Sequence, residues 1–171
     1  MQHAARGAAA RFCEPRDGDC MICVVAAVIE RGGRLLICQR RRGGAFPLKW
    51  EFPGGKMRAG ETPWEALTRE LREELGVGAR IGRELFRVRH SYAELRHPLQ
   101  LFFFAASIET AQRWRNREWP CAVGGAGTKM PFERVLWVKR GDLARYDFLR
   151  ADRELVARLI RGEFADIGVL T

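Results

Sequence analysis

The sequence predicts one domain of mixed α/β (α+β) class, and three observations lead to this prediction. Short apolar runs that are typical of buried strands alternate with two segments of helical periodicity. The chain has 171 residues, 47% of them hydrophobic, which is enough for one domain with a full core. No internal repeat divides it. We therefore expect residues 20–171 to form the domain and residues 1–19, which lack periodicity, to be a disordered N-terminal tail.

Composition restricts the class of partner. The formal net charge of +9 comes mainly from arginine and favours an anionic partner, such as a nucleotide, a polyphosphate or a nucleic acid. A solvated arginine-rich surface would give the same charge, so charge alone does not choose among these. The chain has no run of 18 apolar residues, and its N-terminus lacks the apolar core of a signal peptide. We expect a cytoplasmic protein without a membrane span.

The five cysteines are too few for a disulfide scaffold in a chain of this length. Cys20 and Cys23 form a CxxC pair, but no second pair or neighbouring histidines complete a zinc site. Cys23 and Cys38 lie in apolar runs, so we expect both to be buried thiols.

Five apolar runs are predicted to be strands, because they are short, rich in β-branched or aromatic residues and bounded by turn residues. They cover residues 20–29, 34–39, 80–90, 99–108 and 133–138. A glycine pair at 32–33 predicts a hairpin turn between the first two. Residues 109–132 are rich in glycine and follow neither pattern, which predicts a mobile insertion or a lid over a substrate.

Two helices are predicted from their end signals. Thr62 is the expected N-cap of the first helix, Glu65 completes a capping box and Gly76 ends the helix. Pro63 suits the first helical position, and a Pro-Gly-Gly turn at 53–55 precedes the segment. The second helix covers residues 152–161 and has Asp152 as its N-cap. The residues of this helix expected to face the core are Leu155, Leu159 and Ile160.

The first helix has an unusual arrangement of acidic residues. At about 100° per residue, one stripe faces the core and three glutamates form a contiguous patch beside it. The stripe contains Trp64, Leu67, Leu71 and Leu75, and the patch contains Glu70, Glu73 and Glu74. Like charges at this spacing repel, so a hard cation such as Mg²⁺ or Mn²⁺ would stabilise them. Ion pairs with Arg69 and Arg72 would do so too, and helix geometry leaves both possibilities open.

The same stretch resembles the signature of the Nudix hydrolases. Gly55 is followed after five residues by Glu61, and after seven more by the run Arg69 to Val77, RELREELGV. Every fixed position of the signature is met. The resemblance implies a mixed β-sheet sandwiched between helices (an α/β/α sandwich). It also implies Mg²⁺-dependent hydrolysis, with Mn²⁺ as a substitute, of a nucleoside diphosphate linked to another group.

By position, the resemblance also assigns roles to residues. Glu70, Glu73 and Glu74 would bind the metal, and Gly55 would add a backbone carbonyl. Arg69 would orient the glutamates, Glu61 would brace the loop, and Glu70 is also a candidate base or base-positioning residue.

The wider stretch from Leu48 to Val77 is similar to the MutT-type members of the family. This similarity implies conversion of a nucleoside triphosphate, for example the oxidised nucleotide 8-oxo-dGTP, to a monophosphate and pyrophosphate. The alternatives are CTP or modified cytidine nucleotides, RNA 5′ ends, and a non-catalytic nucleotide-binding module. The complete glutamate set argues against the last of these. A small nucleotide is favoured over a nucleic acid.

Three residues outside the helix match nucleotide-binding positions of MutT-type proteins. They are Arg40, Phe52 and Asp152. Each of them has an alternative role: Arg40 could be a solvated charge, Phe52 a core residue and Asp152 a helix cap. The subgroup often has a further glutamate where this chain has Pro131, and Glu133 is the nearest substitute.

Overall fold

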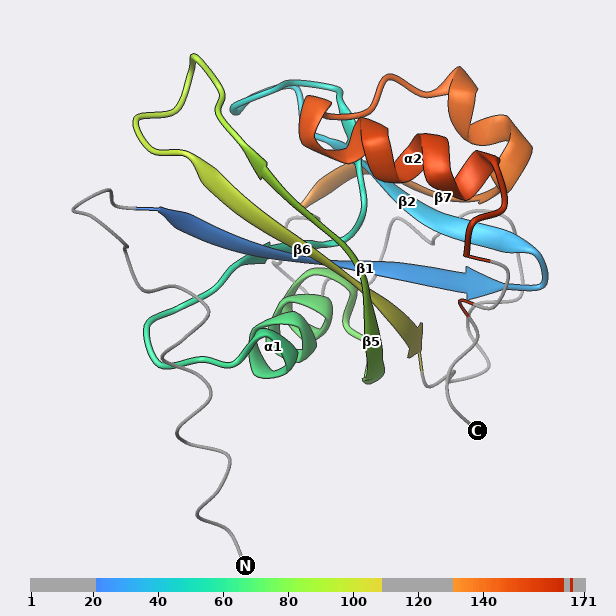
Figure 1. Cartoon of the computed structure of the whole chain (residues 1–171), viewed down its shortest axis with the longest axis horizontal. Coiled ribbons are helices and arrows are strands. Elements are labelled where there is room, and N and C mark those ends of the chain that lie inside the picture. Colours follow the sequence, from blue (N-terminus) through green and yellow to red (C-terminus); the bar gives the residue numbers. More distant parts are fainter. Residues whose placement is uncertain (1–20, 109–130, 165–166, 168–171) are drawn as a thin grey trace, which may run out of the picture.

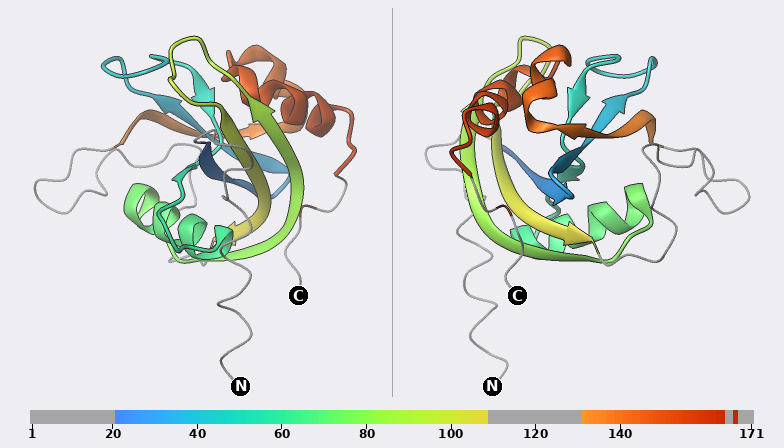
Figure 2. Two further views of the ribbon diagram at one scale, coloured as in Figure 1. Left: turned by 60° about the vertical axis from the view of Figure 1, so that its left-hand side comes forward. Right: turned by 90° about the vertical axis from the view of Figure 1, so that its right-hand side faces the viewer.

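A mixed β-sheet lies at the centre of the protein, whose computed structural model describes residues 21–108, 131–164 and 167. Within these residues the sheet has seven strands in the order β3-β2-β1-β6-β5, with β4 paired to β1 and β7 paired to β2. The strands are β1 (Ile22–Arg31), β2 (Arg34–Arg40), β3 (Trp50–Glu51), β4 (Gly54–Lys56), β5 (Ala79–His90), β6 (Leu99–Ile108) and β7 (Phe132–Lys139). The helices α1 (Pro63–Leu75) and α2 (Arg153–Ile160) cover opposite faces (Figures 1 and 2).

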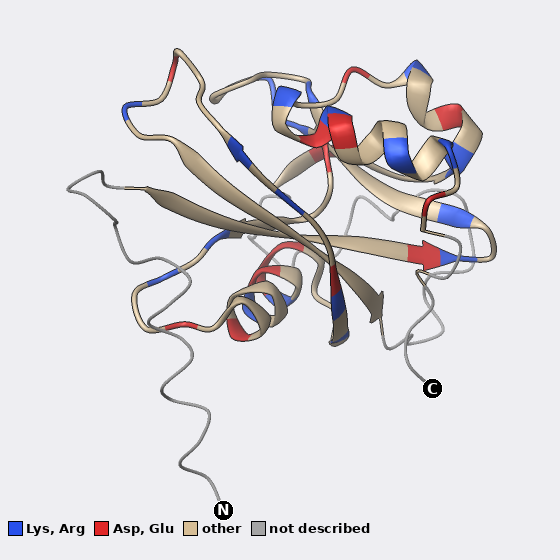
Figure 3. Ribbon diagram, in the orientation of Figure 1, with Lys and Arg blue, Asp and Glu red and all other residues tan. Residues whose placement is uncertain are grey.

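The two central strands explain why the layers pack as they do. β1 and β6 run parallel, and their side chains alternate between the two faces of the sheet. Val25 and Phe102 pack in the cluster that contains the buried face of α1, whereas Val28 and Phe103 pack in the cluster that contains α2. Both strands are therefore apolar on both faces, and they carry almost no charge in Figure 3. The predicted α/β/α layering is confirmed.

The five predicted strands are present, and their ends shift by at most two residues. The two short strands β3 and β4 were not predicted, and at Gly54–Lys56 a strand against β1 replaces the predicted turn. A Cβ on Gly54 would lie 2.1 Å from the Val25 carbonyl oxygen, so only glycine permits this pairing. Hydrophobic periodicity carries no signal for such a strand. The predicted tail and residues 109–130 of the predicted insertion lie outside the described residues, and Phe132 already belongs to β7.

Helix α1 begins and ends where its signals predict. The Thr62 hydroxyl accepts a hydrogen bond from the Glu65 backbone N–H (3.2 Å), and the Glu65 carboxylate accepts one from the Thr62 N–H (2.9 Å). Gly76 adopts φ 66°, as expected for a left-handed C-terminal glycine. Trp64 was wrongly placed in the core, since it is 43% exposed. The buried arc is centred nearer to Ala66 and Leu67, which moves Trp64 to its edge.

The second helix differs more from its prediction. Leu155 and Leu159 are buried as expected, but Ile160 is 41% exposed. Asp152 makes no side-chain cap hydrogen bond, because a 3₁₀ turn, η3 (Arg150–Asp152), precedes the helix. Of the two cysteines, Cys38 is a buried free thiol as predicted, whereas Cys23 is disulfide-bonded. Among the described residues, no helix is long and apolar enough to cross a membrane.

Candidate active site

A cavity of about 330 Å³ opens beside β4 and the C-terminal half of α1. It brings together five of the residues singled out from the sequence, which are Arg40, Phe52, Gly55, Glu74 and Asp152. Its walls also include side chains that the sequence analysis did not select, notably Phe46, Glu51 and Tyr92. One end of this cavity is acidic and borders α1, and the other is mostly apolar.

The acidic end is built by the close packing of α1 against β4. The Glu74 carboxylate accepts a hydrogen bond from the Gly54 backbone N–H (3.3 Å). A Cβ on Gly55 would lie 2.5 Å from the Glu70 carboxyl carbon, so glycine lets this carboxylate lie against the β4 backbone. The helix and the glycine strand thus place two carboxylates and exposed backbone atoms side by side.

Arg69 organises the remaining acids of the motif. Its guanidinium, 16% exposed, donates to Glu61 (2.6 and 2.9 Å), to Glu70 (2.6 Å) and to Glu73 (3.3 Å). It also donates to the Lys56 carbonyl oxygen (3.1 Å). The hydrogen bonds from Arg69 are the main reason that the pKa of Glu61 falls to about 2. These contacts agree with the predicted bracing, while the catalytic roles stay predictions.

Glu73 is placed differently from its two neighbours. It is 48% exposed and is paired with Arg58 (3.2 Å) as well as with Arg69. In the part of the chain that the structure describes, no three Asp, Glu, His or Cys residues form a group that could hold a metal ion. The predicted patch is therefore divided between two carboxylates, Glu70 and Glu74, beside β4 and one at the surface.

The acidic end of the cavity nevertheless suits a divalent cation. Burial, together with the charges of Glu51 and Glu70, raises the pKa of Glu74 to about 8. The charges of Glu51 and Glu70 next to Glu74 are negative and Arg40 offsets them only in part, so the site is short of positive charge. A hard cation with oxygen ligands would supply that charge. Glu70, Glu74 and the backbone of Gly55 are the groups that would hold it.

Arg40 is half-buried and forms an ion pair, so it is not a simple solvated charge. Its guanidinium donates to the Glu51 carboxylate (2.8 and 3.1 Å) and to the Ala45 carbonyl oxygen (3.0 Å). Burial raises the pKa of Glu51, and Arg40 opposes this shift. Glu51 is a residue that sequence reasoning missed. The available signal was one acidic residue between two aromatic residues, Trp50 and Phe52.

Asp152 forms the far end of the cavity instead of capping a helix. It is 2% exposed, and its Oδ2 accepts a long hydrogen bond from the Phe52 backbone N–H (3.4 Å). Burial raises its pKa well above the usual range, and the Glu51 charge adds to the effect. When such a carboxyl is protonated, it offers one donor and one acceptor to a ligand. Tyr92, the other missed residue, lies in the loop after β5 and accepts from the Ala151 N–H (3.0 Å).

Phe52 is a core residue that also lines the cavity, and its nucleotide-binding role stays a prediction. Its ring is 3% exposed and packs against Phe103 and Phe148 at centroid distances of 6.0 and 5.5 Å. Its backbone N–H reaches Asp152. Phe52 therefore shapes the floor of the cavity through its ring and holds Asp152 through its backbone.

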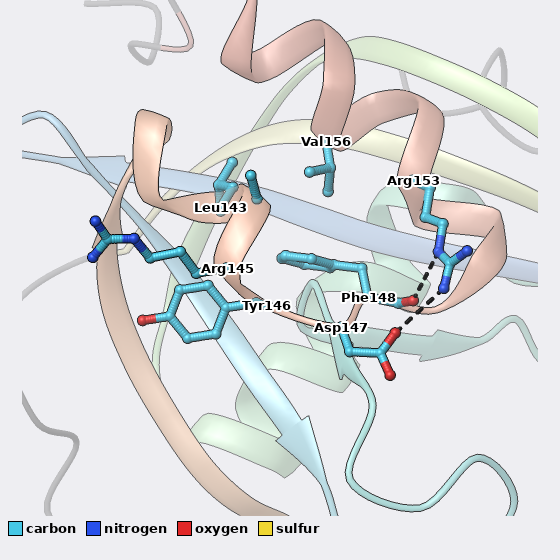
Figure 4. A pocket seen from close by; sticks show the side chains of 8 residues that line it. Leu143, Arg145, Tyr146, Asp147, Phe148, Arg153 and Val156 are labelled. Carbon is cyan, nitrogen blue, oxygen red and sulfur yellow. Dashed lines mark hydrogen bonds and ion pairs between the residues drawn. The ribbon is translucent and has the colours of Figure 1, made fainter.

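The segment before Asp152 is fastened to β3. The Trp50 N–H donates to the Asp147 carbonyl oxygen (3.0 Å), and the Leu149 N–H donates to the Trp50 carbonyl oxygen (2.9 Å). Asp147 pairs with Lys49 and with Arg153, and Figure 4 shows the Arg153 pair at a separate hollow of the surface. Residues about 100 positions apart in sequence thereby meet in one wall. By contrast, Glu133 pairs with Arg42 (3.6 Å) and is not among the described residues that line the cavity.

Comparison with known proteins agrees with this geometry. The NUDIX domain model matches residues 21–159. The 8-oxo-dGTP diphosphatase of Haemophilus influenzae is 34% identical over 144 residues, which cover 83% of this chain and 94% of that protein. The CTP pyrophosphohydrolase of Escherichia coli is 52% identical over 62 residues, but this match covers only 36% of this chain and 46% of that protein.

A solved structure supports the same placement. The Escherichia coli ORF135 protein superposes with a TM-score of 0.66 at 27% identity, covering 90% of this chain and 98% of that one. The family match spans most of the chain and includes the glycine strand, α1 and the segment that carries Asp152. The chain therefore belongs to the NUDIX domain family and is a Nudix hydrolase of the MutT type.

Proposed function

We propose that the protein hydrolyses a nucleoside triphosphate to a monophosphate and pyrophosphate with Mg²⁺, for which Mn²⁺ can substitute. One observation carries this proposal. A single cavity connects the carboxylates beside Gly54 and Gly55 with an apolar end closed by Asp152. A phosphate chain bound with a divalent cation suits the first end, and a nucleobase suits the second.

The bound cation would neutralise the pyrophosphate and lower the pKa of an attacking water. The chain's own residues set up this reaction. Glu70 and Glu74 hold their carboxylates against the β4 backbone, and Arg69 keeps Glu70 and Glu73 in place. Glu70 is the residue we assign as the base, or as the group that orients the water. Glu73 supplies a further carboxylate at the rim.

The nucleobase is the less constrained part of the substrate. A protonated Asp152 presents a donor beside an acceptor. The N7–H and O6 of 8-oxoguanine match this pair, whereas N7 and O6 of guanine are both acceptors. The N4 amino group and N3 of cytosine also match it. We therefore propose an oxidised purine as the main substrate, in line with the H. influenzae relative, and a cytidine nucleotide as the alternative, in line with the E. coli CTP pyrophosphohydrolase.

A substrate panel tests this proposal. Purified protein is incubated with Mg²⁺ and with 8-oxo-dGTP, dGTP, CTP, 5-methyl-dCTP or a triphosphorylated RNA, and kcat/KM is measured for each. We expect the highest value for 8-oxo-dGTP, a lower one for dGTP, and no activity with EDTA. A preference for CTP would select the cytidine alternative. If only the RNA is hydrolysed, the substrate is an RNA 5′ end and not a free nucleotide. Absence of any turnover would indicate a binding module. Action on free nucleotides also leads us to propose a cytoplasmic location.

A further inference from the structure

The loop between β2 and β3 has an unusual backbone. Phe46 adopts φ 56° and Leu48 adopts φ 60°, although neither is a glycine. Bulky residues rarely adopt this left-handed conformation, and Phe46 also precedes a proline, which favours extended backbone. Strained backbone of this kind persists only where its surroundings enforce it, and it often occurs at ligand sites.

Several hydrogen bonds enforce the conformation of this loop. The Gln39 side chain donates to the Leu48 carbonyl oxygen (3.0 Å), and the Arg40 N–H donates to that of Lys49 (2.9 Å). The Arg40 guanidinium donates to the Ala45 carbonyl oxygen while it binds Glu51. Arg40 thus connects the cavity wall to the residue that directly precedes Phe46.

The strained loop holds the Phe46 ring at the cavity. Phe46 is half-buried and lines the cavity, and its ring lies 4.5 Å from that of Tyr92. Tyr92 in turn contacts the His90 ring at 4.4 Å and binds Ala151 through its hydroxyl. A core phenylalanine would not need two strained residues to position it. Phe46 and Tyr92 thus form an aromatic wall of the cavity, near Asp152, and the His90 ring packs against Tyr92.

We infer that Phe46 is a substrate-binding residue that stacks on the nucleobase, with Tyr92 as its support and Arg40 as the residue that positions its loop. This inference deepens the proposed function and rests on it. The ring offers a flat, apolar face to a planar base, while Asp152 reads the edge of the base. Arg40 then acts as a positioning residue through Ala45 and Glu51, in place of the direct contact with the nucleotide that the family resemblance implies.

Product inhibition tests the inference, because the two products report on opposite ends of the cavity. The inhibition constants of dGMP, CMP and inorganic pyrophosphate are measured for the wild type, Phe46→Ala and Phe46→Tyr. Loss of base stacking should raise the constants of both monophosphates and the KM of the triphosphate by ~5- to 150-fold in Phe46→Ala. Inhibition by pyrophosphate should change by less than about twofold, and Phe46→Tyr should restore the wild-type values.

Leu48→Gly is the matched control. It lies in the same loop with the same left-handed backbone, and it is not among the described residues that line the cavity. All three constants should stay near the wild-type values, since glycine accepts this conformation readily. Unchanged monophosphate inhibition in Phe46→Ala, or equal weakening of monophosphate and pyrophosphate, would overturn the inference while the proposed function stands. If the wild type shows no turnover, the proposed function fails instead. Calorimetric binding of dGMP and CMP to the same variants then tests whether Phe46 contacts the base.

Discussion

The two ends of the cavity are encoded in different ways. The acidic end is contained in 23 consecutive residues, Gly55 to Val77, and Arg69 alone contacts three of its glutamates. The apolar end combines residues from the loop after β2, from β3, from the loop after β5 and from η3. The local end is a preorganised charge network, whereas the distant end depends on the tertiary fold. Substitutions should therefore affect chemistry at the first end and base selection at the second.

The largest expected effect is loss of hydrolysis in Glu74→Gln. Removal of a carboxylate from the acidic end should lower kcat by about a thousandfold, equivalent to about 4 kcal/mol of transition-state stabilisation. The amide keeps the shape of the side chain and removes a charge that burial disfavours. The melting temperature should consequently stay the same or rise. Pyrophosphate release and thermal unfolding are the two measurements, and retained activity would remove Glu74 from the reaction.

Arg69→Ala should cost the most stability, because it leaves several partly buried carboxylates without their shared partner. We expect a loss of about 3 kcal/mol in the free energy of unfolding, measured by urea denaturation, together with reduced kcat. Arg72→Ala, an exposed position on the same helix, is the control and should change stability by less than about 0.5 kcal/mol. Equal losses for the two variants would mean that Arg69 is an ordinary surface charge.

At the apolar end, substitutions of Asp152 should change selectivity more than rate. Asp152→Asn keeps one donor and one acceptor, so it should retain most of the kcat/KM for 8-oxo-dGTP. Asp152→Ala should lower this value by about 10- to 100-fold, as a lost buried hydrogen-bonding group would, and should affect dGTP less. The ratio of the two kcat/KM values is the measurement. The same ratio in Asp152→Ala and in the wild type would exclude Asp152 from base recognition.

The stability of the protein without metal should also depend on pH. The folded-state pKa of Glu74 is raised to about 8, above the ordinary value of 4.5. The folded protein therefore holds a proton that the unfolded chain has released, and its stability falls as pH rises from about 4.5 to 8. The slope should reach at most about 1.4 kcal/mol per pH unit from this group. Urea unfolding of EDTA-treated protein should show this decrease of stability with pH. In Glu74→Gln, the part of the decrease that Glu74 contributes should be absent.

The difference between the two ends of the cavity also explains which features could be predicted from the sequence. The strands, the caps of α1 and the glutamate motif depend on periodicity and short spacings, and these were found. The strand at Gly54 was missed because its only signal is the absence of a Cβ near Val25. Glu51 and Tyr92 were missed because nothing near them in sequence reveals that they meet Asp152, about 100 and 60 positions away. Asp152 itself was identified through the family resemblance, since its local context indicates a helix cap.

Product identity tests the central claim most directly, namely that the two ends act on one nucleotide. Wild-type protein, Mg²⁺ and 8-oxo-dGTP are incubated, and the products are separated by anion-exchange chromatography. We expect equal amounts of 8-oxo-dGMP and pyrophosphate from the wild type, and about a thousandfold less of both from Glu74→Gln in the same time. Release of a nucleoside diphosphate with inorganic phosphate, or equal turnover by the variant, would contradict it.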